Sequence, residues 1–359
     1  MRRKKVIVGL SGGVDSSVSA LLLKEKGYDV YGVFMKIFDE KNEELGKKKS
    51  ACYGPEKKDL EDAKKVCKIL NIPLYVVDLK KEYNEIVLKY FVKEYIEGRT
   101  PNPCVICNRF IKFDILLKKV LSVGINFDFF ATGHYARVEY DEKRKRYILK
   151  KGIDEKKDQS YFLFLLTQEQ LSKIIFPLGN YTKKQVRELA KKYNLHLSDK
   201  EESQDFVCGD RSFFFKNRDK EGFIVDKYGH ILGRHKGIVY YTIGQRKGLG
   251  IAKGKKLYVI GIDEKENKII VGEEKDLYKK YLIAENLNYV SIEKLENEKR
   301  VEAKIRYKHI PAKCIIKPID EKKVEVIFEQ EQRAPTPGQA IVFYENQEVV
   351  GGGFITQTY

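Results

Sequence analysis

The sequence predicts an α/β protein with an amino-terminal doubly wound parallel sheet and two smaller β-rich domains, the last a small β-barrel. Three observations lead to this prediction. Strand and helix patterns alternate over about the first 135 residues, and a glycine-rich loop joins the first strand to the first helix. After about Tyr193, short apolar runs between Gly and Pro replace the helical periodicity. We place the domains at residues 1–212, 213–281 and 282–359.

The individual elements follow in order along the chain. Apolar runs predict strands, and apolar residues at helical spacing predict helices. The segment 39–58 is polar and lysine-rich, and we expect it to form a loop near the ligand-binding site, which in such a sheet lies beyond the carboxyl ends of the strands. In the first domain we expect strands at 6–10, 29–35, 74–78 and 129–132, and helices ending near 26 and spanning 57–70, 83–97 and 108–123. In the later domains we expect strands at 222–226, 323–328 and 340–344.

Composition limits the class of protein and of partner. Among 359 residues, 69 Lys and Arg against 52 Asp and Glu leave a net charge of +17, which favours a polyanion such as nucleic acid. A well-solvated lysine-rich surface is the alternative. No apolar stretch approaches the roughly 18 residues of a membrane span, and the start lacks a signal-peptide core. We therefore expect a cytoplasmic protein without a membrane partner, whose six cysteines are thiols, ligands or catalysts.

The first glycine-rich loop has the properties of a phosphate-binding site. It spans residues 9–17, between an apolar strand and a helical pattern. Gly12 and Gly13 let backbone N–H groups approach an anion, and serine hydroxyls add hydrogen-bond donors. The loop lacks the spacing and the lysine of a Walker A motif. It resembles instead the SGGxDS loop of ATP pyrophosphatases, which split ATP into AMP and pyrophosphate.

A second notable segment carries two cysteines, Cys104 and Cys107, after two prolines. The prolines stiffen the approach to a helix start, and a helix amino terminus lowers the pKa of a thiol in its first turn. A redox pair is an alternative, whereas zinc is disfavoured because no second CxxC and no HxxxH is present. Cys67 and Cys314 lie in apolar patterns and are expected in cores. Cys52 lies in the polar loop and belongs to no motif.

Eight segments together resemble the bacterial tRNA-specific 2-thiouridylase family, whose amino-terminal domain is an ATP-pyrophosphatase sheet. The resemblance runs in the family's order from Gly9 to about Gly353, nearly the whole chain. The segments are GLSGGVDSS at 9–17, VFMK at 33–36, TPNPCVICN at 100–108, ATGHYA at 131–136, KDQSYFL at 157–163, ESQDFVCG at 202–209, YTIGQRKGLG at 241–250 and RAPTPGQA at 333–340.

The resemblance implies 2-thiolation of the wobble uridine, position 34, of tRNA. ATP adenylates the C2 oxygen of uracil, and AMP then leaves as sulfur arrives. Asp15 would orient Mg²⁺ or pyrophosphate, its alternative role being a helix cap. By resemblance, Met35 would contact adenosine through its backbone, and Gly133 would close the nucleotide pocket. The loop that would hold the triphosphate of ATP consists of Gly9, Leu10, Ser11, Gly12, Gly13, Val14, Asp15 and Ser16.

The resemblance also implies a sulfur route through cysteines. Cys208 would carry a persulfide from a sulfur donor, such as a cysteine desulfurase or a sulfur-relay protein. Cys107 would be the partner nucleophile that frees sulfide or forms a disulfide with Cys208. Many members carry Asp where this chain has Cys104. Because three cysteines in one pocket also suit a 4Fe-4S cluster, we keep that cofactor as the alternative to the persulfide route.

The target base must leave the anticodon stack to reach such a pocket. By resemblance, the substrate is a tRNA for Lys, Glu or Gln. Its target base would be cradled by Asn102, Pro103 and Cys104. Its other contacts would be Lys157, Asp158, Gln159, Arg306 and Tyr307. Arg306 can pair with a phosphate and Tyr307 can stack on a base, although an edge strand with one solvated cation would look the same.

Two other classes of function share parts of this pattern. Another ATP pyrophosphatase, such as an amidating synthetase or a lysidine or 4-thiouridine synthase, would need the loop but neither Cys208 nor the segment 244–246. A non-catalytic RNA-binding or iron-sulfur module would need no ATP chemistry. Pyrophosphate release that depends on unmodified tRNA distinguishes the thiouridylase from an amidating synthetase and from a binding module.

Overall fold

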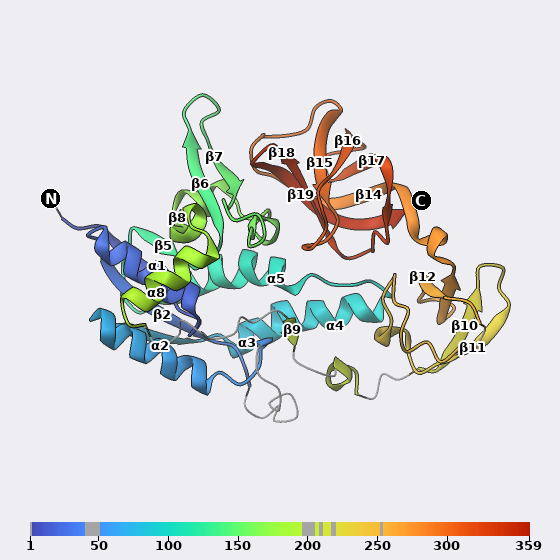
Figure 1. Cartoon of the computed structure of the whole chain (residues 1–359), viewed down its shortest axis with the longest axis horizontal. Helices are drawn as coiled ribbons and strands as arrows, with labels where there is room; N and C mark the ends of the chain where they lie inside the picture. The colour runs from blue at the N-terminus through green and yellow to red at the C-terminus, as the bar shows by residue number, and fades with distance from the viewer. Residues whose placement is uncertain (1, 40–50, 196–204, 208–210, 217–219, 252–253) are drawn as a thin grey trace. The chain divides into compact units, whose positions relative to one another are not determined.

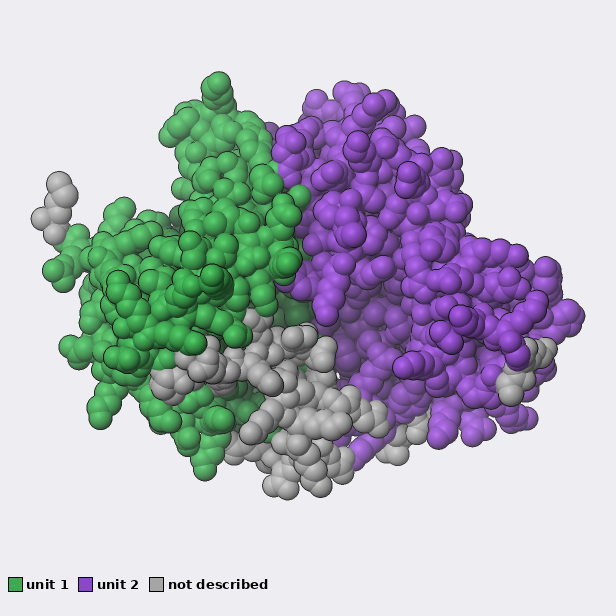
Figure 2. All heavy atoms as spheres, viewed as in Figure 1, with its two compact units in different colours: residues 1–86, 104–210, 347–349 green, residues 87–103, 211–346, 350–359 purple. Residues whose placement is uncertain are grey.

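A computed structural model describes residues 2–39, 51–195, 205–207, 211–216, 220–251 and 254–359. Internal contacts divide the chain into two compact units (Figure 2). Unit 1 comprises residues 1–86, 104–210 and 347–349, and unit 2 comprises residues 87–103, 211–346 and 350–359. No helix in the described part of the chain is long and apolar enough to cross a membrane.

Unit 1 is built on a five-stranded parallel sheet (Figure 1). Its order, β4-β2-β1-β5-β8, places β1 at the centre, and every pair of neighbours is parallel. The strands are β1 (Lys5–Gly9), β2 (Asp29–Lys36), β4 (Leu74–Asp78), β5 (Phe129–Ala131) and β8 (Ile174–Ile175). The predicted parallel sheet is thus confirmed, with the expected strands at their expected places to within a residue or two.

Helices cover both faces of this sheet because successive strand residues point to opposite sides. Val6 and Val8 of β1 pack in one core with side chains of α1 (Val14–Glu25), α2 (Lys57–Leu70) and α8 (Lys183–Lys192). Phe130 of β5 points the other way and meets Phe113 of the π-helix η3 (Cys107–Ile115), with ring centroids 5.5 Å apart. The sheet is therefore doubly wound, as predicted.

Two helical segments differ from the sequence prediction. The helix expected at 108–123 begins at Pro103, which suits a first helical position because it needs no N–H partner. The helix expected at 83–97 is interrupted by a π-helical turn. The helices are α1 (Val14–Glu25), α2 (Lys57–Leu70), α3 (Lys80–Tyr83), π-helix η2 (Asn84–Leu88), α4 (Lys89–Ile96), α5 (Pro103–Ile106), π-helix η3 (Cys107–Ile115), α6 (Leu116–Ser122), α7 (Gln168–Ser172) and α8 (Lys183–Lys192).

Two strand pairs lie outside the central sheet of unit 1. The antiparallel hairpin of β6 (Ala136–Asp141) and β7 (Arg146–Lys151) projects from the unit (Figure 1). The short strands β3 (Ala51–Tyr53) and β9 (Asp205–Val207) pair in parallel. This second pair joins the end of the polar loop to the segment that leads to Cys208, which itself lies outside the described residues.

Unit 2 contains a four-stranded sheet and a six-stranded barrel. The sheet, in the order β11-β10-β13-β12, is formed by β10 (Gly222–Asp226), β11 (Ile231–His235), β12 (Tyr258–Asp263) and β13 (Lys268–Gly272). Pairing of the first and last barrel strands closes the barrel around an apolar core, as predicted. The barrel strands are β14 (Tyr278–Tyr289), β15 (Lys299–Lys304), β16 (Ala312–Pro318), β17 (Lys323–Arg333), β18 (Ala340–Glu345) and β19 (Glu348–Thr358).

Candidate active site

The phosphate loop lies between β1 and α1, where two glycines permit close backbone approach. Gly12 has φ of +70°, and a Cβ there would come within 2.4 Å of the carbonyl oxygen of Asp59. A Cβ on Gly133 would come within 2.7 Å of the backbone nitrogen of Ser16. Only glycine fits at these positions without a shift of the backbone. The loop after β5 and the start of α2 therefore both close on the phosphate loop.

Hydrogen bonds within the loop fix its shape. The Ser16 hydroxyl accepts from the backbone N–H of Ser11 at 3.2 Å and donates to the carbonyl of Gly13 at 3.1 Å. The Ser17 hydroxyl donates to the same carbonyl at 2.8 Å. These bonds hold the loop at the amino terminus of α1, where amide groups without an intrahelical partner and the helix dipole favour an anion.

Asp15, in the first turn of α1, is held by two side chains from distant segments. The ammonium of Lys183 on α8 lies 2.8 and 2.9 Å from the two carboxylate oxygens, and the Tyr135 hydroxyl donates to Oδ1 at 2.8 Å. The Lys183 side chain is 11% exposed. Asp15 thus forms a mostly buried ion pair, which differs from the helix-cap alternative. Sequence reasoning missed Lys183 because no local signal connects residues 168 positions apart.

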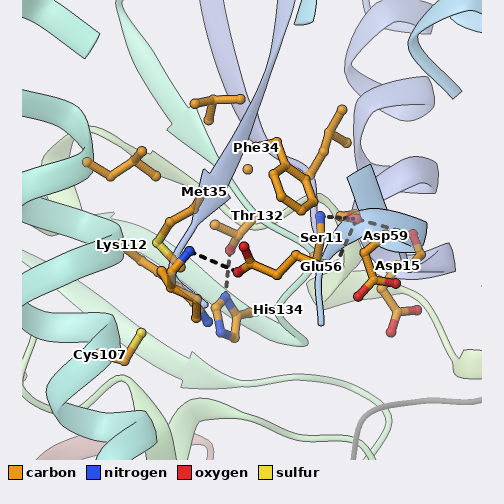
Figure 3. A pocket seen from close by; sticks show the side chains of 18 of the residues that line it. Ser11, Asp15, Phe34, Met35, Glu56, Asp59, Cys107, Lys112, Thr132 and His134 are labelled. Atoms are coloured by element: carbon orange, nitrogen blue, oxygen red, sulfur yellow. Dashed lines mark hydrogen bonds between the residues drawn. The ribbon is translucent and has the colours of Figure 1, made fainter. Parts of the chain in front are cut away.

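A cavity of about 350 Å³ in unit 1 brings the loop and the thiols together (Figure 3). In Figure 3, Ser11 and Asp15 lie on one side and Cys107 and Lys112 on the other. Gly12 is the one predicted ATP-site residue that does not line the cavity. The predicted residues that do are Gly9, Leu10, Ser11, Gly13, Val14, Asp15, Ser16, Met35, Gly133, Cys104, Cys107 and Gln159.

The two cysteines of the CxxC segment lie where the sequence placed them, at a helix start. Cys104 lies in the first turn of α5 and Cys107 begins η3. Cys107 is 6% exposed, and Cys104 is more accessible. Asn108, next in the chain, donates from Nδ2 to the carbonyl of Phe162 at 3.1 Å and anchors this turn. The chain therefore presents two thiols to the cavity from one helical turn.

Cys67 and Cys314 lie in hydrophobic cores, as the sequence predicts. Cys67 packs in the core of unit 1, and burial raises the pKa of its thiol to about 11. Cys314 packs in the barrel core, where burial raises the thiol pKa to about 12. Both thiols are therefore protonated and unreactive near neutral pH. The side chain of Cys52 and all of Cys208 lie outside the described residues.

His134 lines the cavity, although no role was predicted for it from the sequence. Its Nδ1 lies 2.6 Å from the Thr132 hydroxyl. Burial, aided by the nearby charge of Lys112, lowers the pKa of the imidazole well below its ordinary value of 6.5. A neutral imidazole can donate or accept a hydrogen bond without adding charge to the site. The ATGHYA segment was a recognisable signal, but only Gly133 in it had been assigned.

Three further charged residues line the cavity without having been predicted: Glu56, Asp59 and Lys112. Burial raises the pKa of Glu56 to about 7, although hydrogen bonds from the backbone of Ile37 and Phe38 act to lower it. Asp59 follows on α2 and approaches Gly12 through its backbone. Glu56 stands at the end of the polar segment, Asp59 on α2 and Lys112 on η3, and charge is common on the solvated faces of such segments. The sequence therefore offered no way to select them.

The segment 157–159 contributes to the cavity through one residue. Gln159 lines it and accepts from the backbone N–H of Tyr135 at 3.0 Å through Oε1. Asp158 is buried, and its Oδ1 accepts from the backbone N–H groups of Gly152 and Ser160, each at 3.1 Å. The Asp158 carboxylate therefore makes its hydrogen bonds within its own loop and holds that loop in one conformation. Lys157 is half-buried beside it.

In unit 2, the segment 100–102 is tied to the RAPTPGQA segment. Gln339 donates from Nε2 to the carbonyls of Thr100 and Pro101 at 3.1 and 2.9 Å. The backbone N–H of Asn102 donates to the Tyr90 hydroxyl at 3.2 Å, and Asn102 is 7% exposed. Two motifs far apart in the sequence are therefore hydrogen-bonded to each other within unit 2.

Arg306 and Tyr307 lie in the turn between β15 and β16 of the barrel. Arg306 donates from Nη1 to the carbonyl of Arg333 at 3.0 Å, and the ammonium of Lys304 lies 5.5 Å from the Tyr307 ring centroid. Lys308 is exposed in the same turn. The pair is thus part of a cationic turn beyond the end of a strand, and not of an edge strand.

Comparisons with known proteins cover nearly the whole chain. Residues 4–209 match the family model described as the tRNA methyl transferase HUP domain. Residues 215–273 match the tRNA methyl transferase PRC-barrel domain, and residues 279–355 the aminomethyltransferase beta-barrel domain.

Full-length relatives carry a more specific name, tRNA-specific 2-thiouridylase MnmA. The protein of Acetivibrio thermocellus is 49% identical over 99% of this chain and all of its own length. That of Caldanaerobacter subterraneus is 52% identical over 98% of this chain and 97% of its own. That of Caldicellulosiruptor saccharolyticus is 49% identical over 98% of each.

Proposed function

The chain belongs to the tRNA-specific 2-thiouridylase family and is an ATP-dependent tRNA sulfurtransferase, and from this premise we propose that the cavity of unit 1 performs both chemical steps. The observation that carries the proposal is that the phosphate loop and the thiols of Cys104 and Cys107 line one cavity. Activation of an oxygen and its replacement by sulfur need these two kinds of group within reach of the same atom.

In the first step, the C2 oxygen of the wobble uridine attacks the α-phosphorus of ATP and pyrophosphate leaves. The residues Gly9 to Ser16 hold the triphosphate through backbone amides and the dipole of α1. Met35 contacts adenosine through its backbone, and Gly133 closes the pocket. Asp15 and Asp59 fit a Mg²⁺ that accompanies the triphosphate, because carboxylates and phosphates are its preferred ligands.

The adenylated oxygen makes the second step feasible, because AMP is a far better leaving group than a carbonyl oxygen. The terminal sulfur of a Cys208 persulfide attacks C2, and AMP departs with the original oxygen. The Cys107 thiolate then attacks the Cys208 sulfur, which frees the 2-thiouridine and leaves a Cys107–Cys208 disulfide for an external reductant. Alternatively, Cys107 attacks the persulfide first and releases sulfide as the nucleophile.

The sulfur enters from an external donor such as a cysteine desulfurase or a sulfur-relay protein. We propose tRNAs for Lys, Glu and Gln as substrates, with Asn102, Pro103 and Cys104 against the target base. Lys157, Gln159, Arg306 and Tyr307 supply further contacts, and Asp158 orders its loop. We keep domains at 1–212, 213–281 and 282–359, and a cytoplasmic location, as parts of this proposal.

A 4Fe-4S cluster is the alternative carrier of sulfur. Cys104 and Cys107 both line the cavity and fit two cluster ligands, whereas the third, Cys208, lies outside the described residues. Anaerobically purified protein with a cluster would be brown, and Cys104→Asp would lose both colour and activity with free sulfide. On the persulfide route the protein is colourless, and Cys104→Asp keeps its activity.

The experiment that tests the function follows pyrophosphate and 2-thiouridine together. With ATP, a sulfur donor and unmodified tRNA, we expect pyrophosphate release only when the tRNA carries uridine at position 34. A tRNA with cytidine at that position is the matched control. Pyrophosphate release without tRNA, or equal release with the control tRNA, would contradict the proposal.

A further inference from the structure

The side chain of Glu56 offers the cavity a hydrogen-bond acceptor that no described residue uses. Glu56 immediately precedes α2 and lines the cavity. Its Oε1 accepts from the backbone N–H of Ile37 at 2.9 Å. Its Oε2 is buried and has no hydrogen-bond partner among the described residues. A buried carboxylate oxygen without a partner is destabilising, so the site is arranged for a donor that arrives with a ligand.

The position of Glu56 indicates which part of a nucleotide would supply that donor. In an open parallel sheet, a ligand lies across the carboxyl ends of neighbouring strands. The phosphates occupy the loop after β1, so the base extends toward the end of the adjacent strand, β2. Ile37, which holds Glu56, follows that end directly, and Met35 at the same end also lines the cavity (Figure 3).

We infer that Glu56 is a specificity-determining residue that accepts a hydrogen bond from the 6-amino group of adenine. Adenine carries N–H donors at this position, whereas guanine and hypoxanthine carry an oxygen acceptor that would face the carboxylate. Because burial raises its pKa to about 7, the carboxyl gains from a ligand that stabilises its charged form. This inference deepens the proposed function and rests on ATP being the nucleotide bound in this cavity.

The chain offers an unusually direct test, because the bond from Ile37 fixes which end of an amide would face the ligand. In Glu56→Gln, the Ile37 N–H still requires an oxygen acceptor, so the amide NH₂ would point toward the base. That group donates where Glu56 accepts. The substitution should therefore shift the preference from adenine toward a 6-oxo purine, a change that a merely structural role would not produce.

The measurement is equilibrium binding of ATP, inosine triphosphate and purine riboside triphosphate to the full chain. The wild type should bind ATP at least about tenfold more tightly than the triphosphate without a 6-substituent, as expected for a hydrogen bond to a charged group. Glu56→Ala should reduce this ratio to within about threefold, and Glu56→Gln should raise the inosine-to-adenine affinity ratio about tenfold. Glu61→Gln, an exposed carboxylate on the same helix, should change neither ratio.

Pyrophosphate binding, equal in all variants, checks that the phosphate loop is intact. If Glu56→Ala and Glu56→Gln bind ATP but keep the wild-type ratios, the inference is wrong while the proposed function stands. If the wild type binds none of the three triphosphates, the proposed function itself fails. If Glu56→Ala does not fold, the ratio for Glu56→Gln alone decides, and an unchanged ratio overturns the inference.

Discussion

The cavity of unit 1 and the β15–β16 turn of unit 2 use their charged residues in opposite ways. In the cavity, Asp15 is held by Lys183 and Tyr135 in a mostly buried network. In the turn, Arg306 donates from Nη1 to the carbonyl of Arg333, and the neighbouring Lys308 is exposed. Buried, mutually bonded charges position atoms for chemistry, whereas accessible cations attract a polyanion and fix it only loosely.

Because the two regions differ in this way, catalysis and tRNA affinity should be separable by mutation. Changes in the cavity should lower the rate of a chemical step and leave tRNA binding nearly intact. Changes in the barrel turn should weaken tRNA binding in a salt-dependent manner and leave ATP binding intact.

Asp15→Ala should give the largest loss. It removes the carboxylate at the phosphate loop and leaves Lys183 mostly buried without its partner. We expect tRNA-dependent AMP formation to fall at least about 100-fold, as when a group that orients transition-state charge is removed, with little change in tRNA affinity. Glu188→Gln, on the exposed face of α8, is the control. Near-normal AMP formation by Asp15→Ala would show that the phosphate loop is assigned wrongly.

Lys183→Met should also act on the chemical step, through Asp15. Removing one partner of a buried pair leaves an uncompensated charge, which typically costs about 3 kcal/mol, equivalent to a loss of roughly 100-fold. Part of this should appear as a lower kcat for AMP formation and part as a lower unfolding temperature. Lys184→Met changes the next residue, whose side chain is 87% exposed. If both variants behave alike, the ion pair has no role in activation.

Arg306→Ala and Tyr307→Ala should weaken tRNA binding about tenfold each, by loss of a phosphate contact and of a stacked ring. The Kd for ATP should not change. Binding of the Arg306 variant should also depend less steeply on salt, by about one unit in the slope of log K against log salt. Arg300→Ala, on the neighbouring strand, is the control for general loss of charge. An equal effect on ATP and tRNA would indicate that the turn serves stability instead.

Glu56→Gln should change stability with a defined pH dependence. The pKa of Glu56 is raised from 4.5 to about 7 in the folded protein, so the folded state binds more protons than the unfolded state between these values. Its carboxylate therefore destabilises the fold increasingly as pH rises from about 4.5 to 7, by up to about 3 kcal/mol. Without ligand, the variant should melt at a higher temperature than the wild type at pH 8 and at a similar temperature at pH 4.5. A pH-independent difference would contradict this origin.

The phosphate loop was predictable because its information is contiguous. Its glycines, its serines and the strand and helix around it fall within residues 6–25, and their order alone predicts an anion site. The alternation of strands and helices similarly defined the parallel sheet. The CxxC segment gave the helix start, although the structure begins that helix at Pro103.

The remaining cavity residues were not predictable because distant segments bring them together. Lys183 reaches Asp15 from α8, and Glu56 is held by Ile37 across a loop. In a highly charged chain, the residues around a lysine or glutamate in a polar segment do not indicate whether it has such a distant partner. The burial of Asp158 was hidden for a different reason: its Oδ1 accepts hydrogen bonds from two backbone N–H groups, which are present in every loop and give no signal in the sequence.

The most direct measurement of the central claim uses Cys107→Ser in single-turnover reactions with ATP, sulfur donor and unmodified tRNA. If the cavity performs activation and sulfur transfer as separate steps, this variant should still release at least about one pyrophosphate per enzyme in a tRNA-dependent manner. It should form almost no 2-thiouridine, measured by mass spectrometry of the digested tRNA. Normal amounts of 2-thiouridine, or loss of pyrophosphate release in a variant that still binds ATP and tRNA, would contradict the account.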